Sequence, residues 1–291
     1  MKIDFCSDLH VDAWHHTTKL YDPTRKRWLG EPFQSTFVDI DWEQYKNPDS
    51  EILIIAGDIS NDMMSSTNVV ECASLVYDYV VVVDGNHDHY NNDVPVEEAM
   101  ELFKQNISRF TNVYYLDGQH SLTLEGIRFL GVTGWYDWKA YETQGISDFT
   151  AKRTWGQYSN DSRYPTFVCD GPNSLAMQQA VNLADQVRLA NEDDTVDNVV
   201  ITTHMSPRAD LMEWKPNDPV WNALTPSYVN TAMDMVLREN TNGKIGHWIY
   251  GHTHARQMVQ KDGILYMNNA RGYPRENPPF TLVQFEINST T

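Results

Sequence analysis

Short apolar runs that end in a polar residue recur along this chain. Five of them are followed, within a few residues, by Asp, Asn or His. Short apolar runs bounded by Gly and polar residues are typical of buried strands. The five runs cover residues 2–5, 52–56, 79–83, 198–203 and 247–250.

Helical periodicity separates several of these strands. Because a helix between two strands implies a parallel pair with a right-handed crossover, the order of elements predicts an α/β fold. Glu125-Gly126 is expected to close a hairpin between two shorter strands. The helices are expected at about 67–77, 97–110, 174–191 and 227–238, and the further strands at 113–116, 121–124, 127–132, 264–267 and 280–287.

Three long segments lack this periodicity and are rich in aromatic residues, at about 11–50, 133–170 and 205–226. Segments of this length inside a compact domain are usually functional or disordered, and the aromatic content favours order. With no repeat or linker in the sequence, we expect one domain over residues 1–291 whose three insertions wall the site and shape the substrate. Core packing is the simpler explanation for most of the aromatic side chains.

The bulk composition favours a cytoplasmic protein. A chain of 291 residues can bury a substantial core, and its longest apolar runs are far shorter than the roughly 18 residues that cross a membrane. The N-terminus enters a strand pattern directly, without the apolar core of a signal peptide. Cys6, Cys72 and Cys169 have no spacing that suggests zinc or a disulfide framework, so we expect reduced thiols.

The formal net charge of −18 limits the partners that we expect. Proteins that bind many phosphates of a long polyanion are usually basic, so extended nucleic acid is disfavoured. Bound divalent metals would supply a local positive centre even in an acidic protein. We therefore expect a small-molecule phosphate ester or a nucleotide as the substrate, and no membrane partner.

The residues that follow the strands share one chemistry, that of metal ligands. In an open α/β fold the carboxyl ends of the strands form the ligand-binding edge. A single His would more often be structural, but five strand ends with such side chains indicate one site. Imidazole and carboxylate without thiolate suit manganese, iron, zinc or nickel. The residues are Asp8, His10, Asp58, Asn86, His87, His204, His252 and His254.

Seven of these side chains, all except His87, are expected to hold two divalent ions, with manganese favoured. Seven ligands for two ions leave positions open for water and substrate, as catalysis requires. Asp58 is our choice for the ligand that bridges the ions. The neutral amide of Asn86 keeps the positive charge of the cluster higher than a third Asp would, which favours phosphate binding.

The ordered motifs resemble those of the calcineurin-like metallophosphoesterase superfamily. They are Asp8-x-His10, Gly57-Asp58, Gly85-Asn86-His87-Asp88, His204 and Gly251-His252-Thr253-His254. The resemblance implies a four-layer αββα sandwich of two mostly parallel or mixed sheets flanked by helices. It also implies that Asp8, His10, Asp58 and His254 bind the first metal, and that Asp58, Asn86, His204 and His252 bind the second.

The catalytic groups are expected beside these ligands. Two ions can share a hydroxide that attacks phosphorus in line. His87 is expected to protonate the leaving oxygen, and an imidazole beside two cations needs a carboxylate neighbour to keep its proton. Asp88 is the nearest candidate in sequence, with capping of the following turn as its alternative role.

Substrate contacts are expected from Asn86, Arg271 and Tyr273. The last two lie in a stretch, 268–274, that is similar to the Asn-x-Arg-Gly-Tyr-Pro of some bacterial and viral members, apart from an extra Ala. His15 and Trp135 are further guesses for the wall of the site.

The leading hypothesis is a phosphodiesterase for a small molecule or nucleotide. Protein phosphatases of the superfamily carry Arg-Gly shortly after Gly-Asp, whereas this chain has Ile59-Ser60-Asn61-Asp62, so that branch is disfavoured. A phosphomonoesterase, a nuclease of the same fold and a catalytically retired metal-binding interaction module stay as alternatives.

Overall fold

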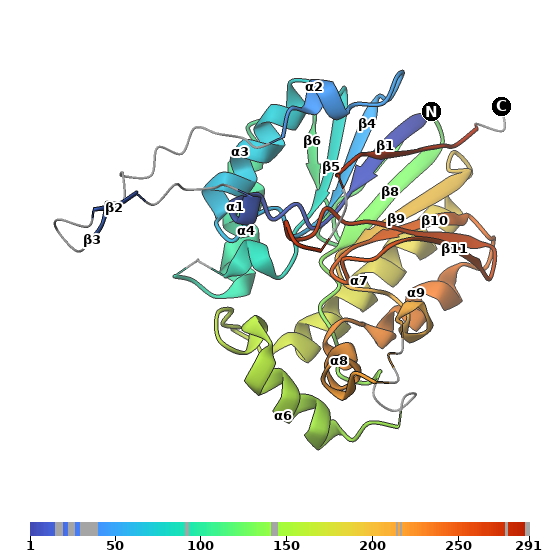
Figure 1. Ribbon diagram of the computed structural model, residues 1–291. Coiled ribbons are helices and arrows are strands. Elements are labelled where there is room, and N and C mark those ends of the chain that lie inside the picture. The colour runs from blue at the N-terminus through green and yellow to red at the C-terminus, as the bar shows by residue number, and fades with distance from the viewer. Residues whose placement is uncertain are drawn as a thin grey trace.

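Two β-sheets pack face to face in this computed structural model, with helices on their outer faces (Figure 1). The structure describes residues 1–14, 20–22, 27–29, 40–90, 93–140, 145–213, 215, 217–276 and 279–288. The layers follow the order helix, sheet, sheet, helix, so the predicted α/β four-layer sandwich is confirmed. No helix within the described part of the chain is long and apolar enough to cross a membrane.

The first sheet has the strand order β13-β1-β4-β5-β6, and its four N-terminal strands run parallel. β13 joins β1 antiparallel at one edge. The strands are β1 (Lys2–Cys6), β4 (Ile52–Ala56), β5 (Tyr79–Val83), β6 (Val113–Tyr115) and β13 (Val283–Glu286).

The second sheet has the order β11-β12-β10-β9-β8-β7, with four parallel strands between two antiparallel edges. The predicted hairpin at Glu125-Gly126 is confirmed by the pairing of β7 with β8. The strands are β7 (Leu122–Leu124), β8 (Ile127–Val132), β9 (Asn198–Thr203), β10 (Ile245–Tyr250), β11 (Arg256–Lys261) and β12 (Ile264–Asn269). A separate pair joins β2 (Leu20–Asp22) to β3 (Arg27–Leu29).

Alternation along each strand divides the apolar side chains among three cores. Ile54 and Val81 of the first sheet and Phe129 and Val200 of the second fill the core between the sheets. Neighbouring positions on each strand face outward instead, because successive side chains point to opposite faces. Both outer faces are therefore apolar and need helices to cover them.

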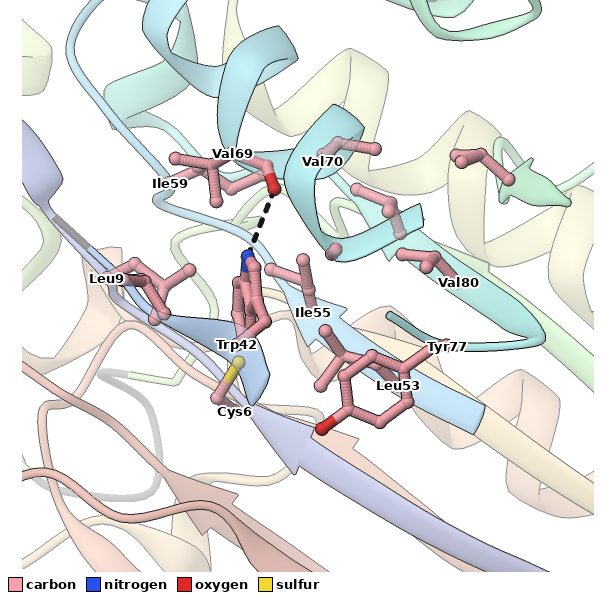
Figure 2. Packing of buried hydrophobic residues seen from close by; sticks show 14 of the residues in the cluster. Cys6, Leu9, Trp42, Leu53, Ile55, Ile59, Val69, Val70, Tyr77 and Val80 are labelled. Carbon is pink, nitrogen blue, oxygen red and sulfur yellow. Dashed lines mark hydrogen bonds between the residues drawn. The ribbon is translucent and has the colours of Figure 1, made fainter. Parts of the chain in front are cut away.

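The outer face of the first sheet is covered by α3 (Met63–Ser74) and α4 (Val96–Ile107). Figure 2 shows Trp42, from α2 (Trp42–Tyr45), wedged in this core, where its Nε1 donates to the carbonyl of Val69 at 3.2 Å. The outer face of the second sheet is covered by α7 (Pro172–Glu192) and α9 (Asp234–Glu239).

Several expected elements differ from the structure. The single helix expected at 227–238 is a 3₁₀ turn, Thr231–Met233, followed by the short α9, because the side chain of Asn230 caps the turn at Ala232. Within the three insertions, the sequence pattern did not show α1 (Val11–Trp14), α2, α6 (Asp148–Tyr158) or α8 (Pro219–Leu224). The expected wall residue His15 lies outside the described residues.

Candidate metal centre

The carboxyl ends of β1, β4, β5, β9 and β10 meet where the two sheets adjoin. An isolated parallel bridge between Ser7 and Ala270 joins the sheets there. The amide of Asp8 donates to the carbonyl of Gly57, and the amide of Gly251 donates to the carbonyl of His204, at 3.0 and 2.9 Å. The strand ends are thus tied to one another by their own backbone.

Five of the predicted ligands adopt backbone conformations that residues other than glycine rarely take. Asp8, His10, Asp58, His252 and His254 have φ between 42° and 66°. Each such residue costs on the order of 1 kcal/mol or more, and such strain is concentrated at functional sites. The turns after three strands therefore hold these side chains in place against a local preference for other conformations.

Glycines that precede the ligands leave room for them. A Cβ on Gly57 would lie 2.6 Å from Nδ1 of His204, and a Cβ on Gly85 would lie 2.2 Å from Oδ1 of Asp58. A Cβ on Gly251 would lie 2.8 Å from Oδ2 of Asp8. These distances are too short for any side chain, so glycine at these positions is a requirement of the site itself.

The side chains form three adjacent groups whose ligand atoms lie within 4.8 Å of one another. The groups are Asp8, His10 and His254; His10, Asp58 and His87; and Asp58, His204 and His252. Asp58 belongs to two of them, because its Oδ2 lies 3.8 Å from Nε2 of His10 and 3.3 Å from Nε2 of His204. His10 also belongs to two of the groups, and the bridging role expected of Asp58 stays a prediction.

Neighbouring groups determine which ring nitrogen two of these histidines, His204 and His254, direct toward the other candidate ligands. Nδ1 of His204 bonds the carbonyl of Ala56 at 2.9 Å, so its Nε2 faces Oδ1 of Asn86 at 3.0 Å. Nδ1 of His254 bonds the carboxylate of Glu276 at 2.6 Å, so its Nε2 faces Nε2 of His10 at 3.0 Å. Such outer partners set the tautomer of a metal-binding imidazole.

Burial and charge pull the pKa values of these groups in opposite directions. Burial raises the pKa of Asp8 and lowers the pKa of His10 and of His252. For His204, burial is outweighed by the carboxylates of Asp58 and Asp8, which raise its pKa to about 10. A cationic charge is therefore strongly favoured between Asp58 and His204.

The donor set fits divalent metal ions. With Nδ1 of His204 donating to a carbonyl, the lone pairs of His204 Nε2, Asn86 Oδ1 and Asp58 Oδ2 converge on one point. Three acceptors in this arrangement need a cation or a proton among them. Nδ1 of His10 is buried without a hydrogen-bond partner among the described residues, whereas its Nε2 faces the site.

A family model of calcineurin-like phosphoesterases matches residues 1–256 of the chain. The chain belongs to the calcineurin-like phosphoesterase family. The family is metal-dependent and acts on phosphate esters, in agreement with the resemblance and with the three ligand groups.

Relatives of this calcineurin-like phosphoesterase have diverged widely in sequence. It is 24% identical over 250 residues to the uncharacterized protein L509 of Acanthamoeba polyphaga mimivirus, a match that covers 82% of this chain and 85% of that protein. Among solved structures, it is similar in fold to phosphopantetheinyl hydrolase (PptH) from Mycobacterium tuberculosis. The TM-score is 0.70 at 15% identity, and the match covers 98% of this chain and 95% of the other. A putative 5'-nucleotidase from Staphylococcus aureus matches with a TM-score of 0.46 at 16% identity, over 94% of this chain and 49% of that one.

The predicted proton donor of this phosphoesterase, His87, lies beside the ligands. Its ring packs edge-on against His10 with centroids 4.6 Å apart. Its Nδ1 lies 2.6 Å from Oδ1 of Asn61 and its Nε2 lies 3.3 Å from the hydroxyl of Tyr273. Tyr273 also stacks on His10, which places it beside the candidate ligands, and its contact with substrate stays a prediction.

Asp88 is placed to cap a turn, which was the alternative to the catalytic role that we expected. Its buried carboxylate accepts hydrogen bonds from the amides of Ile59, Ser60 and Gly85 and from the hydroxyl of Ser66. These contacts hold the turn after Asp58 against the turn after β5. The alternative role, capping a turn, describes them better than a pairing with His87.

Two other residues, Arg271, expected as a substrate contact, and Trp135, expected in the wall of the site, are buried. Arg271 is only 6% exposed, and its guanidinium lies 4.1 Å from the ring centre of Trp14 while Nη1 donates to the carbonyl of Leu9. It therefore supports the turn that carries Asp8 and His10. Trp135 is fully buried and packs against Phe167, which is the core role named as the simpler explanation.

The sequence reasoning missed three residues that orient side chains of the site. Asn61 contacts His87, Asp161 contacts the candidate ligand Asn86, and Glu276 contacts the candidate ligand His254. Asn61 follows Asp58 by three positions and Glu276 follows the 268–274 stretch, so proximity to a motif could have suggested both. Asp161 lies in a segment without periodicity, and no local signal identifies it.

Proposed function

We propose that this protein is a two-metal phosphoesterase that hydrolyses a small-molecule or nucleotide phosphodiester. The observation that carries the proposal is the position of Asp58, whose carboxylate is shared by two groups of candidate ligands. A carboxylate between two clusters suits a pair of ions better than a single one. The strained turns and the obligatory glycines indicate that the site is built for more than structural support.

In this proposal Asp8, His10, Asp58 and His254 hold one ion, and Asp58, Asn86, His204 and His252 hold the other. The ions supply Lewis acidity and lower the pKa of water. Manganese is favoured because imidazole, carboxylate and amide without thiolate suit it. The rigid backbone contacts among the strand ends keep the ligands in place, so that substrate binding requires little rearrangement.

His87 protonates the leaving oxygen from Nε2. Asn61 holds Nδ1, which directs Nε2 toward the ligand groups. The hydroxyl of Tyr273 can donate a hydrogen bond to Nε2 when the imidazole of His87 is neutral. This contact holds the imidazole in the same orientation between turnovers. The stack of Tyr273 on His10 fixes the tyrosine in turn.

A small substrate is supported by charge and by the surrounding segments. The net charge of −18 opposes a long polyanion. Tyr228, which follows the third insertion, packs on His252, and Trp221 of the insertion packs on Tyr228, so aromatic rings lie beside the site. PptH, the neighbour of similar fold, is a phosphopantetheinyl hydrolase, which agrees with a small phosphate-containing substrate.

The test compares hydrolysis of bis-p-nitrophenyl phosphate with that of p-nitrophenyl phosphate by protein that was stripped of metal and reloaded with manganese. We expect turnover of the diester to exceed that of the monoester, and Asp58→Ala to abolish both. A preference for the monoester would replace the diesterase by a phosphomonoesterase. Two bound metals without cleavage of either compound would support the retired interaction module and refute the proposal.

A further inference from the structure

The amide of Asn86 is held by two side chains that are not themselves candidate ligands. Its Nδ2 donates to Oδ1 of Asp161 at 2.8 Å and to the hydroxyl of Tyr90 at 2.9 Å. The Tyr90 hydroxyl donates to the same Asp161 oxygen at 2.6 Å, which closes a triangle. All three side chains are buried, with exposed fractions of 2%, 7% and 4% for Asn86, Tyr90 and Asp161.

Asp161 reaches this position from the second insertion. It lies in the 3₁₀ turn Asn160–Ser162 directly after α6, 75 residues beyond Asn86 in the sequence. Ser159 caps the turn by accepting from the amide of Asp161. The second insertion therefore contains a turn whose central carboxylate contacts the candidate ligand Asn86.

The chemistry of the triangle decides which end of the amide faces the ligands. An ionised carboxylate accepts hydrogen bonds and donates none, so it can pair only with the NH₂ of Asn86. A tyrosine hydroxyl can donate or accept, so Tyr90 alone would permit either orientation of the amide. With the NH₂ turned toward Asp161, Oδ1 of Asn86 faces Nε2 of His204 at 3.0 Å.

We propose that Asp161 is a positioning residue of the metal centre, which holds the oxygen of Asn86 toward the second metal. The inference rests on the proposed function, because it takes Asn86 as a metal ligand. It goes further by making the second insertion part of the metal site, through a residue that touches no metal. Donation of a hydrogen bond from the amide NH₂ of Asn86 to the carboxylate of Asp161 also makes the amide oxygen a stronger ligand, as outer partners of metal ligands generally do.

The experiment titrates Mn²⁺ into metal-free full-length protein by isothermal titration calorimetry. Wild type is expected to show two binding events. In Asp161→Ala one of them should weaken about 10–100-fold, the usual effect of losing an outer partner, while the other stays within a few-fold of wild type. Asp148→Asn is the matched control, because this exposed residue of α6 pairs with Lys152 in the same insertion. It should leave both affinities unchanged.

A second pair of variants separates positioning from a structural role. In the Asn86→Asp background the ligand has two equivalent oxygens, so orientation no longer matters and Asp161 faces a like charge. Asp161→Asn should therefore tighten Mn²⁺ binding in the Asn86→Asp background. In the protein with Asn86, the same change should weaken Mn²⁺ binding or leave the affinity within a few-fold of wild type. A merely structural Asp161 would weaken binding in both backgrounds, which would overturn the proposal even if Asp161→Ala failed to fold.

The remaining outcomes are distinct. Wild-type affinity at both sites in folded Asp161→Ala would refute the positioning role and leave the proposed function intact. Fewer than two Mn²⁺ bound by the wild type would instead refute the two-metal function, and the inference with it.

Discussion

Replacing Gly85 by alanine tests whether the glycine that precedes Asn86 exists to make room for Asp58. The added Cβ would lie 2.2 Å from Oδ1 and 2.4 Å from the amide nitrogen of Asp58. Ordinary contacts between such atoms are about 3.5 Å, so one of the two segments must move by about 1 Å. Neither segment is free to do so, because the amide of Gly85 donates to Asp88 and Oδ1 of Asp58 accepts from the amide of His87.

We expect Gly85→Ala to lower kcat for the diester about 100-fold, since a displacement of about 1 Å at a catalytic site costs that much. Crowding should also lower the free energy of unfolding by about 1–3 kcal/mol. The assay measures kcat with saturating manganese and, separately, urea unfolding of the metal-free protein.

Gly156→Ala is the matched control, because Gly156 lies on α6 and its Cβ would meet nothing within 4 Å. There the same change should leave kcat unaltered and raise the free energy of unfolding by about 0.5–1 kcal/mol, as alanine does in a helix. Wild-type turnover and two tightly bound manganese ions in Gly85→Ala would refute the steric reasoning.

Three further predictions concern other contacts. Asn61→Ala should lower kcat at least about 10-fold with little change in KM, because His87 loses its orientation; Asn61→Asp, which can still accept this hydrogen bond, should retain most of the rate. Asp84→Ala should lower the free energy of unfolding in urea by about 3–5 kcal/mol, because buried partners from both sheets lose their acceptor; a loss below about 1 kcal/mol would contradict this. Burial of Asp117 is outweighed by hydrogen bonds, first from Lys104, that lower its pKa to about 2 from about 3.9 when unfolded. Its stabilisation is therefore present above pH 4 and lost as the pH falls toward 2, so Asp117→Asn should cost on the order of 1 kcal/mol at pH 7 and progressively less below pH 4; an equal cost at pH 3 would contradict the assignment.

The fold and the candidate ligands could be predicted from the sequence where the signal is local. β4, β5, β8 and β9 have the predicted bounds, because these strands are largely buried and show as short runs that are rich in apolar and β-branched residues. The ligands follow such runs directly. Their convergence on one edge then needs only the parallel arrangement of the strands.

Elements without a continuous apolar face escaped prediction. α6 buries only Ala151 fully, so it has no apolar stripe to detect. β11 is an edge strand whose side chains are all partly or fully exposed, and its sequence, Arg-Gln-Met-Val-Gln-Lys, does not resemble a core strand. The contact of Asp161 with Asn86 depends on the path of the insertion that contains α6, which no short sequence pattern encodes.

The bridge between Ser7 and Ala270 has a consequence for how the nascent chain folds on the ribosome. Asp8 is synthesised long before its partner, because its carboxylate accepts a hydrogen bond from the amide of His252, 244 residues later. The bridge after β1 likewise joins Ser7 to a residue that is synthesised later still. The first sheet can gain β1, β4, β5 and β6 early in translation, whereas the contacts at the carboxyl ends of these strands stay incomplete until β10 and β12 have left the exit tunnel. A nascent chain that has formed most of the first sheet therefore still lacks the complete set of candidate metal ligands, which assembles only after His252 and His254 have been synthesised.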